Sequence, residues 1–533
     1  MIDFSHIWGK GQLLSFSGLD GQTDYRNGLV LRTRTEAIAL DVKQPETAGA
    51  VIRFSGSAFD GIDIAGDCLL VHSGDKTSTL VFADAWNVVL EGSWTLENSG
   101  ELLESLDCGV RKIVATKGFL KPAWQEASVR ELVRQRTAFL EKQTLPEGLP
   151  EELRGAACKA IAMLKGQVYA PEGQLPCLWS TPDRWPHANM WNWDSVFHSL
   201  GMRHICPDAA RQFISAVFAT QREDGFIAHM MTPYKISDIT QPPLLGLAIE
   251  AIHASEAAPE WVAGLVPKLA RYLEWIMANR DKDGDGLLEW LPDQHSPHGS
   301  DESGMDNSPR FDGPMTLAAV DFNAYLAREC EAMSRLQPER REYWLGHHDR
   351  ICAGLNRFCW DEELGLYVDY DTVAKKRMDV MSSAGFMPLL CGAPSKEQVA
   401  RMVAHLHNPK TFGTPFRVPS IAACNTAAYK KDMWRGPAWI NMNYLIAVGL
   451  LRHGCQEEAR ELMLETCREE ARHYRKYGTF FEYYDDKGVD GPPDLLRKSN
   501  VPPYEGWETY SQVMFDYGWS GTLYLEMIHL LFA

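Results

Sequence analysis

The spacing of hydrophobic residues changes once along this chain of 533 residues, and that change constrains the fold more than any other feature. Up to about residue 120, short β-branched stretches alternate with polar side chains and are separated by Gly, Asp, Ser and Asn, as in 29–35, 51–54, 79–82 and 110–114. This pattern is typical of an antiparallel β-sandwich. After residue 150 the apolar residues recur at helical spacing, which predicts a helical region with almost no strands.

The helical spacing occurs about eleven times after residue 150. One helix, for example, begins at Pro207 and presents Phe213, Val217 and Phe218 on one face. So many helices suit a toroid of inner and outer helices, although the spacing alone fits a bundle or a solenoid equally well. The predicted helices span 151–166, 189–203, 207–218, 242–256, 265–276, 313–334, 339–358, 395–407, 437–453, 455–475 and 517–532.

Between the two regions, residues 126–142 predict a charged helix, and turn residues at 144–150 end it. A chain of this length is too long for one ordinary core. The sequence therefore predicts a β-sandwich domain over 1–120, a linker helix over 121–150 and a helical domain over 151–533.

The formal net charge of −18 argues against a nucleic-acid partner, because binding to phosphates needs a basic face. Twelve cysteines are scattered singly, without the spacing of a zinc site or a disulfide scaffold, as in reduced cytosolic proteins. The N-terminus lacks a basic stretch followed by an apolar one, and no apolar run approaches ~18 residues. We expect a cytoplasmic protein without a membrane partner, whose oligomeric state the sequence leaves open.

Two segments, 301–310 and 480–485, each carry a carboxylate among aromatic, small and polar neighbours. Hydrolysis of a glycosidic bond requires two carboxylates, one to protonate the leaving oxygen and one to activate water or attack the anomeric carbon. The pair therefore predicts a glycosidase. The neighbours alone do not choose between Glu302 and Asp306 in the first segment, and Asp485 follows Glu482 closely in the second.

Residues 185–198 place three tryptophans around Asp194. Flat aromatic rings stack on a sugar while a carboxylate accepts bonds from its hydroxyl groups, so this segment predicts a sugar subsite. A tryptophan-rich helix start packed in a core is the alternative. Arg435 could bind substrate, and a structural ion pair explains it nearly as well. The predicted substrate-binding residues are Trp191, Trp193, Asp194, Gln241, Asn307, Trp434, Arg435 and Trp439.

Alternating carboxylates at Asp281, Asp283 and Asp285, followed by Glu289, are similar to the first half of a calcium loop. The twelfth position, where an EF-hand needs Glu, holds Pro292. A solvated Asp-Gly turn is the alternative. Calcium bound by these four carboxylates is thus the one metal that the sequence suggests, and no cofactor is expected to be required.

Four motifs occur in a fixed order: Trp193–His198, Gly304–Pro309, Trp434–Trp439 and Glu482–Asp485. Together they resemble glycoside hydrolase family 63 over residues 150–533, and more distantly the trehalases. The resemblance implies an (α/α)6 barrel, inversion at the anomeric carbon, Asp306 as general acid and Glu482 as general base. Partial desolvation beside Met305 would raise the pKa of Asp306 and keep it protonated, as an acid requires.

The sequence as a whole predicts a mainly α fold, an (α/α)6 barrel with an N-terminal antiparallel β-sandwich. The expected function is an inverting, exo-acting α-glycosidase, similar to α-glucosidases, that releases glucose or mannose from a small-molecule α-glycoside. A trehalase-like hydrolase is the alternative among enzymes. A non-hydrolytic sugar-binding module or a helical-barrel epimerase is the alternative from another class, and an epimerase would need bases such as His198 and His229. Candidates for contacts with the aglycone are Arg184, His187, Tyr234, Lys235 and Arg417.

Overall fold

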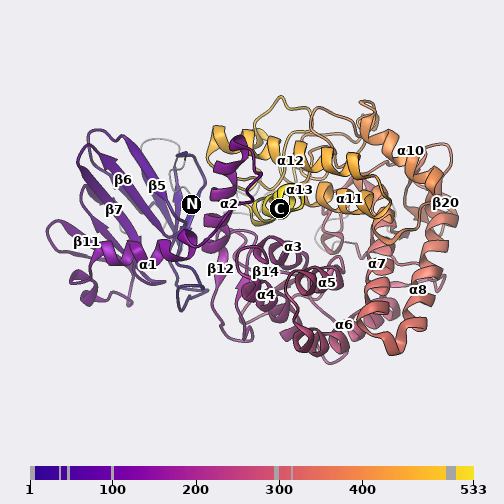
Figure 1. Cartoon of the computed structure of the whole chain (residues 1–533), viewed down its shortest axis with the longest axis horizontal. Coiled ribbons are helices and arrows are strands. Elements are labelled where there is room, and N and C mark those ends of the chain that lie inside the picture. Colours follow the sequence, from indigo (N-terminus) through magenta and orange to yellow (C-terminus); the bar gives the residue numbers. More distant parts are fainter. Residues whose placement is uncertain are drawn as a thin grey trace.

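The computed structural model describes residues 7–34, 38–44, 49–97, 101–292, 299–313, 316–499 and 512–533. Two antiparallel sheets form the N-terminal part, at the left of Figure 1, and helices form most of the remainder. The change of spacing in the sequence therefore corresponds to a change of architecture.

The N-terminal sheets have the strand orders β1-β2-β3-β4-β9 and β10-β11-β8-β7-β6-β5. Buried side chains from both sheets, such as Leu31, Ile52, Leu80 and Val88, form one hydrophobic cluster. The predicted antiparallel sheet region is confirmed. Its strands are β1 (Leu13–Ser15), β2 (Val30–Thr33), β3 (Ala39–Gln44), β4 (Val51–Phe54), β5 (Gly61–Ile64), β6 (Cys68–Ser73), β7 (Lys76–Phe82), β8 (Asn87–Glu91), β9 (Trp94–Glu97), β10 (Leu103–Asp107) and β11 (Arg111–Thr116).

The predicted charged helix is α1 (Val129–Glu141). Its N-cap is Ser128, whose hydroxyl oxygen accepts a hydrogen bond from the Glu131 backbone N–H at 3.3 Å. Val129 and Leu132 are buried on one face, and the helix packs on β7. Helix α1 therefore packs on the second sheet.

The helical part closes on itself as a ring of contacts. Helix α3 packs on α5, α5 on α7, α7 on α9, α9 on α11, α11 on α13, and α13 returns to α3. Helices α2, α4, α8 and α12 pack against members of this ring. The bounds are α2 (Glu151–Gln167), α3 (Asn192–Met202), α4 (Pro207–Ala219), α5 (Leu245–Ser255), α6 (Pro259–Arg280), α7 (Val320–Leu336), α8 (Arg341–Gly354), α9 (Pro388–Cys391), α10 (Lys396–His407), α11 (Ile440–Arg452), α12 (Gln456–Tyr477) and α13 (Gly518–Phe532).

Each of the eleven predicted helices is present, with shifted ends. Helix α7 begins at Val320 instead of near 313, because β16 (Leu317–Ala318) pairs with β19 (Tyr370–Asp371) just before it. Helix α8 is followed by a π-helical turn over Leu355–Cys359. The strands described beyond residue 150 are two residues long, so the helical character of this part was predicted correctly.

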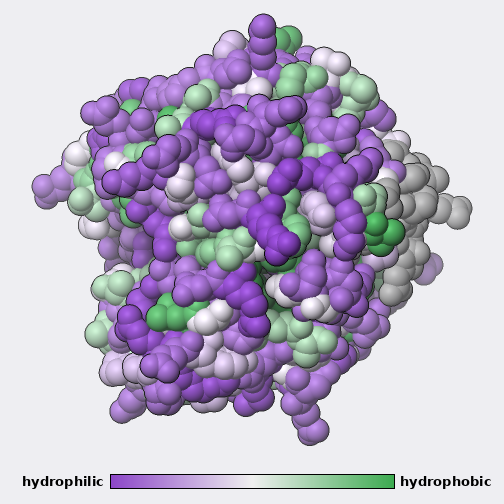
Figure 2. All heavy atoms as spheres, turned by 90° about the vertical axis from the view of Figure 1, so that its right-hand side faces the viewer, coloured by the Kyte–Doolittle hydropathy of each residue, from purple (hydrophilic) through white to green (hydrophobic). Residues whose placement is uncertain are grey.

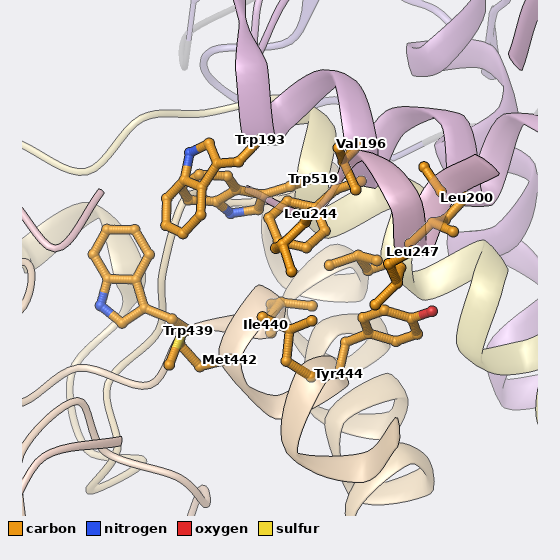
Figure 3. Packing of buried hydrophobic residues seen from close by; sticks show 14 of the residues in the cluster. Trp193, Val196, Leu200, Leu244, Leu247, Trp439, Ile440, Met442, Tyr444 and Trp519 are labelled. Carbon is orange, nitrogen blue, oxygen red and sulfur yellow. The ribbon is translucent and has the colours of Figure 1, made fainter. Parts of the chain in front are cut away.

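The helices of the ring surround an apolar core. Val196 of α3, Leu247 of α5, and Ile440 and Tyr444 of α11 belong to one buried cluster. Figure 3 shows Trp193 and Trp519 beside each other, with Trp439 across from them, continuous with this core. These tryptophans lie in the first turn of α3, in the first turn of α13 and just before α11.

Strand β1 contacts the segment that leads into α13. The Leu13 backbone N–H donates to the carboxylate of Asp516 at 2.9 Å, and Lys159 of α2 forms an ion pair with the same carboxylate at 2.6 Å. The Gln12 side-chain amide donates to the Gly478 carbonyl at 2.8 Å. The sheets are thereby bonded to the residue that precedes Tyr517, the N-cap of α13.

The face that carries α8 and β20 (Lys376–Arg377) lies opposite the sheets (Figure 1). Figure 2 shows that this face is mostly hydrophilic, with apolar side chains in small, separate groups. Throughout the part of the chain that the structure describes, no helix is both long enough and apolar enough to cross a bilayer.

Candidate active site

A cavity of about 130 Å³ lies where the segments before the ring helices meet. Its wall comes from the first turns of α3 and α13, the segments that lead into α3, α5 and α11, the loop between α6 and α7, and the loop between α12 and α13. Six of the eight predicted substrate-binding residues and both predicted catalytic carboxylates are part of it. The described lining residues are His187, Trp191, Trp193, Asp194, His229, Gln241, Asp301, Gly304, Asp306, Met433, Trp434, Trp439, Glu482, Arg497, Lys498, Tyr517 and Trp519.

One wall of the cavity is aromatic. The rings of Trp434 and Trp439 are stacked, with centroids 3.6 Å apart. Trp193 lies 6.4 Å from Trp434 and 5.6 Å from Trp519, again between ring centroids. Flat indole faces at this spacing can cover the apolar face of one sugar ring.

Three polar atoms on this wall are buried and have no hydrogen-bond partner among the described residues: Asp194 Oδ1, Trp191 Nε1 and Trp434 Nε1. An unsatisfied buried donor or acceptor costs roughly 1–3 kcal/mol, so such atoms usually have a partner. Gln241 Oε1, by contrast, accepts from the Trp193 backbone N–H at 3.0 Å, which fixes the Gln241 amide. The wall therefore offers one acceptor, Asp194 Oδ1, and two indole N–H donors that suit the hydroxyl groups of a ligand.

The surroundings of Asp194 disfavour its ionised form. Burial raises the pKa of its carboxyl well above the usual range, and the negative charges of Glu482, Asp183 and Asp306 raise it further. Sugar hydroxyl groups that donate to this carboxylate would stabilise its ionised form.

Asp306 forms an ion pair in the cavity with Lys498, at 2.8 Å between Nζ and Oδ2. The ammonium also lies 3.4 Å from Asp301 Oδ1. Burial raises the pKa of Asp306 to about 6, an effect that Lys498 opposes and the charge of Asp301 reinforces. The expected rise of this pKa is present, with a lysine partner that the sequence did not suggest.

Glu482 has a different partner. Its carboxylate accepts from Arg497 Nε at 3.0 Å, and its backbone carbonyl accepts from the Trp519 indole N–H at 3.0 Å. The Glu482 backbone N–H donates to the Met514 carbonyl at 3.1 Å. The Arg497 guanidinium and these backbone bonds therefore fix the position of the Glu482 side chain at the cavity.

The competing carboxylates are used elsewhere. Glu302 does not line the cavity; it pairs with Arg280 at 2.7 Å and accepts from the backbone N–H groups of Thr240 and Leu291 at 3.0 Å each. Asp485 accepts from the Val489 backbone N–H at 2.9 Å and so closes a turn. Of the two carboxylates between which the sequence left the choice open, Glu302 and Asp306, the cavity holds the second.

Asn307 and Arg435 are not among the described lining residues, although both were predicted to bind substrate. Asn307 Oδ1 accepts from the Trp434 backbone N–H at 3.0 Å, and this bond fixes the backbone of that tryptophan. Arg435 forms an ion pair with Asp312, 2.9 Å between Nη1 and Oδ2. The Arg435 backbone N–H bonds to the Asp432 carbonyl in a tight turn, and in such a turn the side chains of neighbouring residues diverge.

The histidines and cations named from the sequence are mostly engaged outside the cavity. His198 bonds to Ser180 and is fully buried behind the wall, whereas His229 lines the cavity and burial lowers its pKa to about 4. Arg184 donates to the Val168 carbonyl and Arg417 pairs with Glu465. Among the five aglycone candidates, only His187 is a described lining residue.

The sequence did not suggest Asp301, Arg497, Lys498, Tyr517 or Trp519 as site residues, yet all of them line the cavity. One signal was available for the last two. The aromatic pair at 517 and 519, where α13 begins, repeats the pair at 191 and 193, where α3 begins. No comparable pattern marks the two cations.

The predicted calcium loop follows α6. Carboxylate oxygens of Asp281, Asp283 and Asp285 lie within 4.8 Å of one another. Asp281 Oδ1 and Glu289 Oε1 are buried without a hydrogen-bond partner among the described residues, and burial raises the pKa of Glu289 to about 7. Oxygen donors of this kind fit a hard divalent cation, and calcium takes 6–8 of them.

Comparison with known proteins places the site in a family. A family profile described as "Mannosylglycerate hydrolase MGH1-like glycoside hydrolase domain" matches residues 187–491. The mannosylglycerate hydrolase of Rubrobacter radiotolerans is 23% identical over 403 residues, which cover 57% of this chain and 86% of that protein. The glucosylglycerate hydrolase of Mycolicibacterium hassiacum is 22% identical over 410 residues, 57% of this chain and 88% of that protein.

A solved structure shares the fold over 70% of this chain. The glycoside hydrolase family 63 mannosylglycerate hydrolase of Thermus thermophilus, in complex with Tris and D-glycerate, superposes with a TM-score of 0.56 at 22% identity, covering 70% of this chain and 99% of that one. The profile match spans more than half of the chain and includes Asp306, Glu482 and the tryptophans of the wall up to Trp439. The chain therefore belongs to the mannosylglycerate hydrolase MGH1-like family of glycoside hydrolase family 63, and it is a glycoside hydrolase.

Proposed function

We propose that this enzyme hydrolyses a small α-glycoside by removing one terminal glucosyl or mannosyl unit, with inversion at the anomeric carbon. The observation that carries the proposal is a set of buried atoms without a hydrogen-bond partner among the described residues, Asp194 Oδ1 and the indole N–H groups of Trp191 and Trp434, in a cavity that also holds Asp306 and Glu482. Such a wall suits sugar hydroxyl groups, and two carboxylates suit glycosidic hydrolysis.

In the proposed mechanism, Asp306 donates a proton to the glycosidic oxygen as the bond to the anomeric carbon breaks. Glu482 removes a proton from a water molecule that attacks the opposite face of the sugar. The Arg497 guanidinium, 3.0 Å from Glu482, holds the base in place. Asp194 binds a hydroxyl of the same sugar, and this bond contributes to rate if it tightens as positive charge develops on the ring.

The size of the cavity supports removal of one sugar at a time. Its volume of about 130 Å³ is well below the ~300–1,000 Å³ of sites for drug-sized ligands. The closed ring of helix contacts supports an (α/α)6 barrel, whose inner helices would be α3, α5, α7, α9, α11 and α13. We place the barrel over residues 151–533, the β-sandwich over 1–120 and the linker over 121–150.

We also propose that Asp281, Asp283, Asp285 and Glu289 hold a calcium ion. Calcium would offset part of the negative charge of these carboxylates, and it would bond to Asp281 Oδ1 and Glu289 Oε1, which have no hydrogen-bond partner among the described residues. The loop joins the end of α6 to the segment that carries Asp301 and Asp306, so the ion would be structural. It takes no part in the hydrolytic steps.

The activity is tested by measuring hexose release from a panel of α-glycosides: mannosylglycerate, glucosylglycerate, trehalose, kojibiose, nigerose and maltose. Activity on a glycosylglycerate above that on trehalose supports the proposal, and the reverse order supports the trehalase-like alternative. Absence of hydrolysis across the panel, with sugar binding retained, contradicts the proposal.

A further inference from the structure

Asp183 and His187 form a buried pair at the edge of the cavity. The Asp183 carboxylate accepts two hydrogen bonds from His187, one from the backbone N–H at 2.8 Å and one from the ring nitrogen Nδ1 at 2.9 Å. The Asp183 side chain is fully buried, and the His187 side chain is 7% exposed. Asp183 precedes residue 187, where the family match begins, and it is not among the described lining residues. An effect of Asp183 on the chemistry must therefore pass through His187, which does line the cavity.

The second ring nitrogen of His187 faces a cation. His187 Nε2 lies 3.5 Å from Arg497 Nη2. A carboxylate only accepts hydrogen bonds, and a guanidinium only donates them. Asp183 on one side and Arg497 on the other therefore select the same neutral tautomer of His187, with the proton on Nδ1 and a lone pair on Nε2 that accepts from Arg497.

Arg497 in turn contacts both oxygens of Glu482. Its Nε donates to Oε2 at 3.0 Å, and its Nη2 donates to Oε1 at 3.2 Å. Arg497 lies in the loop between α12 and α13, so its planar guanidinium is oriented by side-chain contacts and not by a helix. One continuous chain of contacts thus leads from Asp183 through His187 and Arg497 to Glu482.

The segment that carries Asp183 is itself anchored. The Pro182 carbonyl accepts from the Gly518 backbone N–H, at the start of α13, at 2.6 Å. Arg32 of β2 lies over the Trp185 ring, with its guanidinium carbon 5.2 Å from the ring centroid, a cation–π contact. Asp183 is therefore held between the N-terminal sheets and the helical part, and it offers His187 a fixed acceptor.

A purely structural role would need only part of this arrangement. The bond from the His187 backbone N–H to Asp183 closes a turn, as the bond from Val489 to Asp485 does elsewhere. The bond to Nδ1 adds something that a turn does not need, because it determines which ring nitrogen of His187 can accept from Arg497.

We propose that Asp183 and His187 are positioning residues for the general base. By fixing the tautomer of His187 they orient the Arg497 guanidinium, and through it they aim the Glu482 carboxylate at the attacking water. A misplacement of about 1 Å can cost on the order of 10²-fold in rate, so this orientation bears directly on turnover. The inference rests on the proposed function and adds two residues to it.

The first test is D183N. The substitution keeps an oxygen for the His187 backbone N–H, but it can place an amide donor opposite Nδ1. The proton of the ring then moves to Nε2, where Arg497 can only donate, and the contact with Arg497 is lost. On the best substrate of the α-glycoside panel, we expect kcat to fall at least about tenfold while KM changes by less than about threefold, because the wall that binds the sugar is intact.

A double-mutant cycle with R497M separates positioning from a general loss of structure. If Asp183 acts through Arg497, the variant D183N/R497M should be less than about threefold slower than R497M alone, because both substitutions remove the same link. A structural effect of D183N would instead multiply the loss in both backgrounds.

His187 offers a matched pair of variants. The amide oxygen in H187Q reaches the place of Nε2 and can accept from Arg497, whereas the shorter amide in H187N reaches only the place of Nδ1 and contacts Asp183. We expect H187Q to keep kcat within about fivefold of wild type and H187N to lose about as much as D183N.

Thermal unfolding of each variant checks the fold, and kcat is expressed per folded enzyme. The control is D84N in the N-terminal sheets. Asp84 likewise accepts from a backbone N–H, that of Asn87 at 2.8 Å, and it pairs with Lys121 at 2.8 Å. D84N should lower the unfolding temperature to a similar extent as D183N without changing kcat.

The outcomes are distinct. Unchanged kcat in D183N, multiplied losses in D183N/R497M, or H187N at least as active as H187Q would each overturn the positioning role and leave the proposed function standing. Wild type that hydrolyses no α-glycoside of the panel overturns the proposed function and this inference with it. A lower kcat in D183N that disappears in the R497M background supports the inference.

Discussion

Glu302 and Asp306 lie four residues apart in one loop and have opposite surroundings. Glu302 is fully buried and bonded to Arg280 and two backbone N–H groups. The Asp306 side chain is 20% exposed and faces the cavity, and among the described residues it forms an ion pair with Lys498. The difference shows how a structural carboxylate can be told from a chemical one: Glu302 is enclosed by its hydrogen-bond donors, whereas Asp306 is open to the cavity.

A second buried ion pair lies on the other side of Asp306 in the loop between α6 and α7. Arg310, four residues beyond Asp306, is buried between Asp321 and Asp369, with contacts of 2.6 and 2.7 Å. These groups anchor the loop against α7, while the segment between Glu302 and Arg310 is left to face the cavity. Buried ion pairs of Glu302 on one side and Arg310 on the other thus hold the segment that carries Asp306.

The largest expected effect is that of D306N. Loss of a general acid typically lowers the rate about 10²–10⁴-fold, so turnover of substrates with poor leaving groups should nearly vanish. Activated aryl α-glycosides, which depart without protonation, should be partly spared. Steady-state kinetics on both substrate types measure the difference, and an equal loss on both would remove Asp306 from the role of acid.

The matched control is E302Q. Breaking a buried ion pair costs roughly 3–5 kcal/mol, so this variant should lower the unfolding temperature while the protein that remains folded keeps its turnover. If E302Q lost turnover without loss of stability, Glu302 would be a chemical carboxylate and not a structural one.

Replacement of the general base, Glu482, should have the next largest effect on turnover. E482Q should lower turnover by a similar or somewhat smaller factor, and azide should restore part of the rate if it occupies the position of the attacking water. Proton NMR of the first sugar released by wild type should show the β-anomer from an α-glycoside. The α-anomer as first product would mean retention, and therefore a nucleophile in place of a base.

A smaller effect is expected for D194N. A hydrogen bond between a charged group and a sugar hydroxyl contributes ~1.5–3 kcal/mol, so kcat/KM should fall by about one to two orders of magnitude without unfolding. Kinetics and thermal unfolding together test this. Unchanged kinetics would make Asp194 a structural carboxylate like Glu302.

The smallest effect concerns the calcium loop. Chelation, or D283N, should lower the unfolding temperature by a few degrees, and added calcium should restore it for wild type only. Turnover at low temperature should hardly change, because the loop is outside the cavity. D349N, at an exposed aspartate on α8, is the control. If neither chelator nor calcium changed the unfolding temperature of wild type, the loop would be a solvated turn without a bound ion.

Much of the fold could be predicted from spacing. Long amphipathic helices such as α4 and α12 repeat the signal over several turns, and their positions were predicted to within a few residues. Short strands carry less signal. β10 (Leu103–Asp107) has two charged residues in five and a mostly partly exposed surface, so it was not predicted.

The site could be predicted only where one short segment held the information. Trp193 and Asp194 stand together at a helix start, and Asp306 and Glu482 each lie in a motif. Lys498 lies beside Asp306 only because the loop between α12 and α13 reaches the cavity, a contact that neither the spacing nor the composition of the sequence encodes. Arg435 shows the reverse case, since its neighbour Trp434 faces the cavity while its own guanidinium pairs with Asp312.

The bond between Leu13 and Asp516 has a consequence for how this enzyme tolerates heat. Every described residue of the cavity wall comes from the helical part, yet Asp516, which precedes Tyr517 of that wall, is held by a strand of the N-terminal sheets. Sheets that soften before the helices do would release one end of α13 and disturb the wall. Inactivation would then precede global unfolding, and the working temperature of the enzyme would be set by a region that never touches sugar.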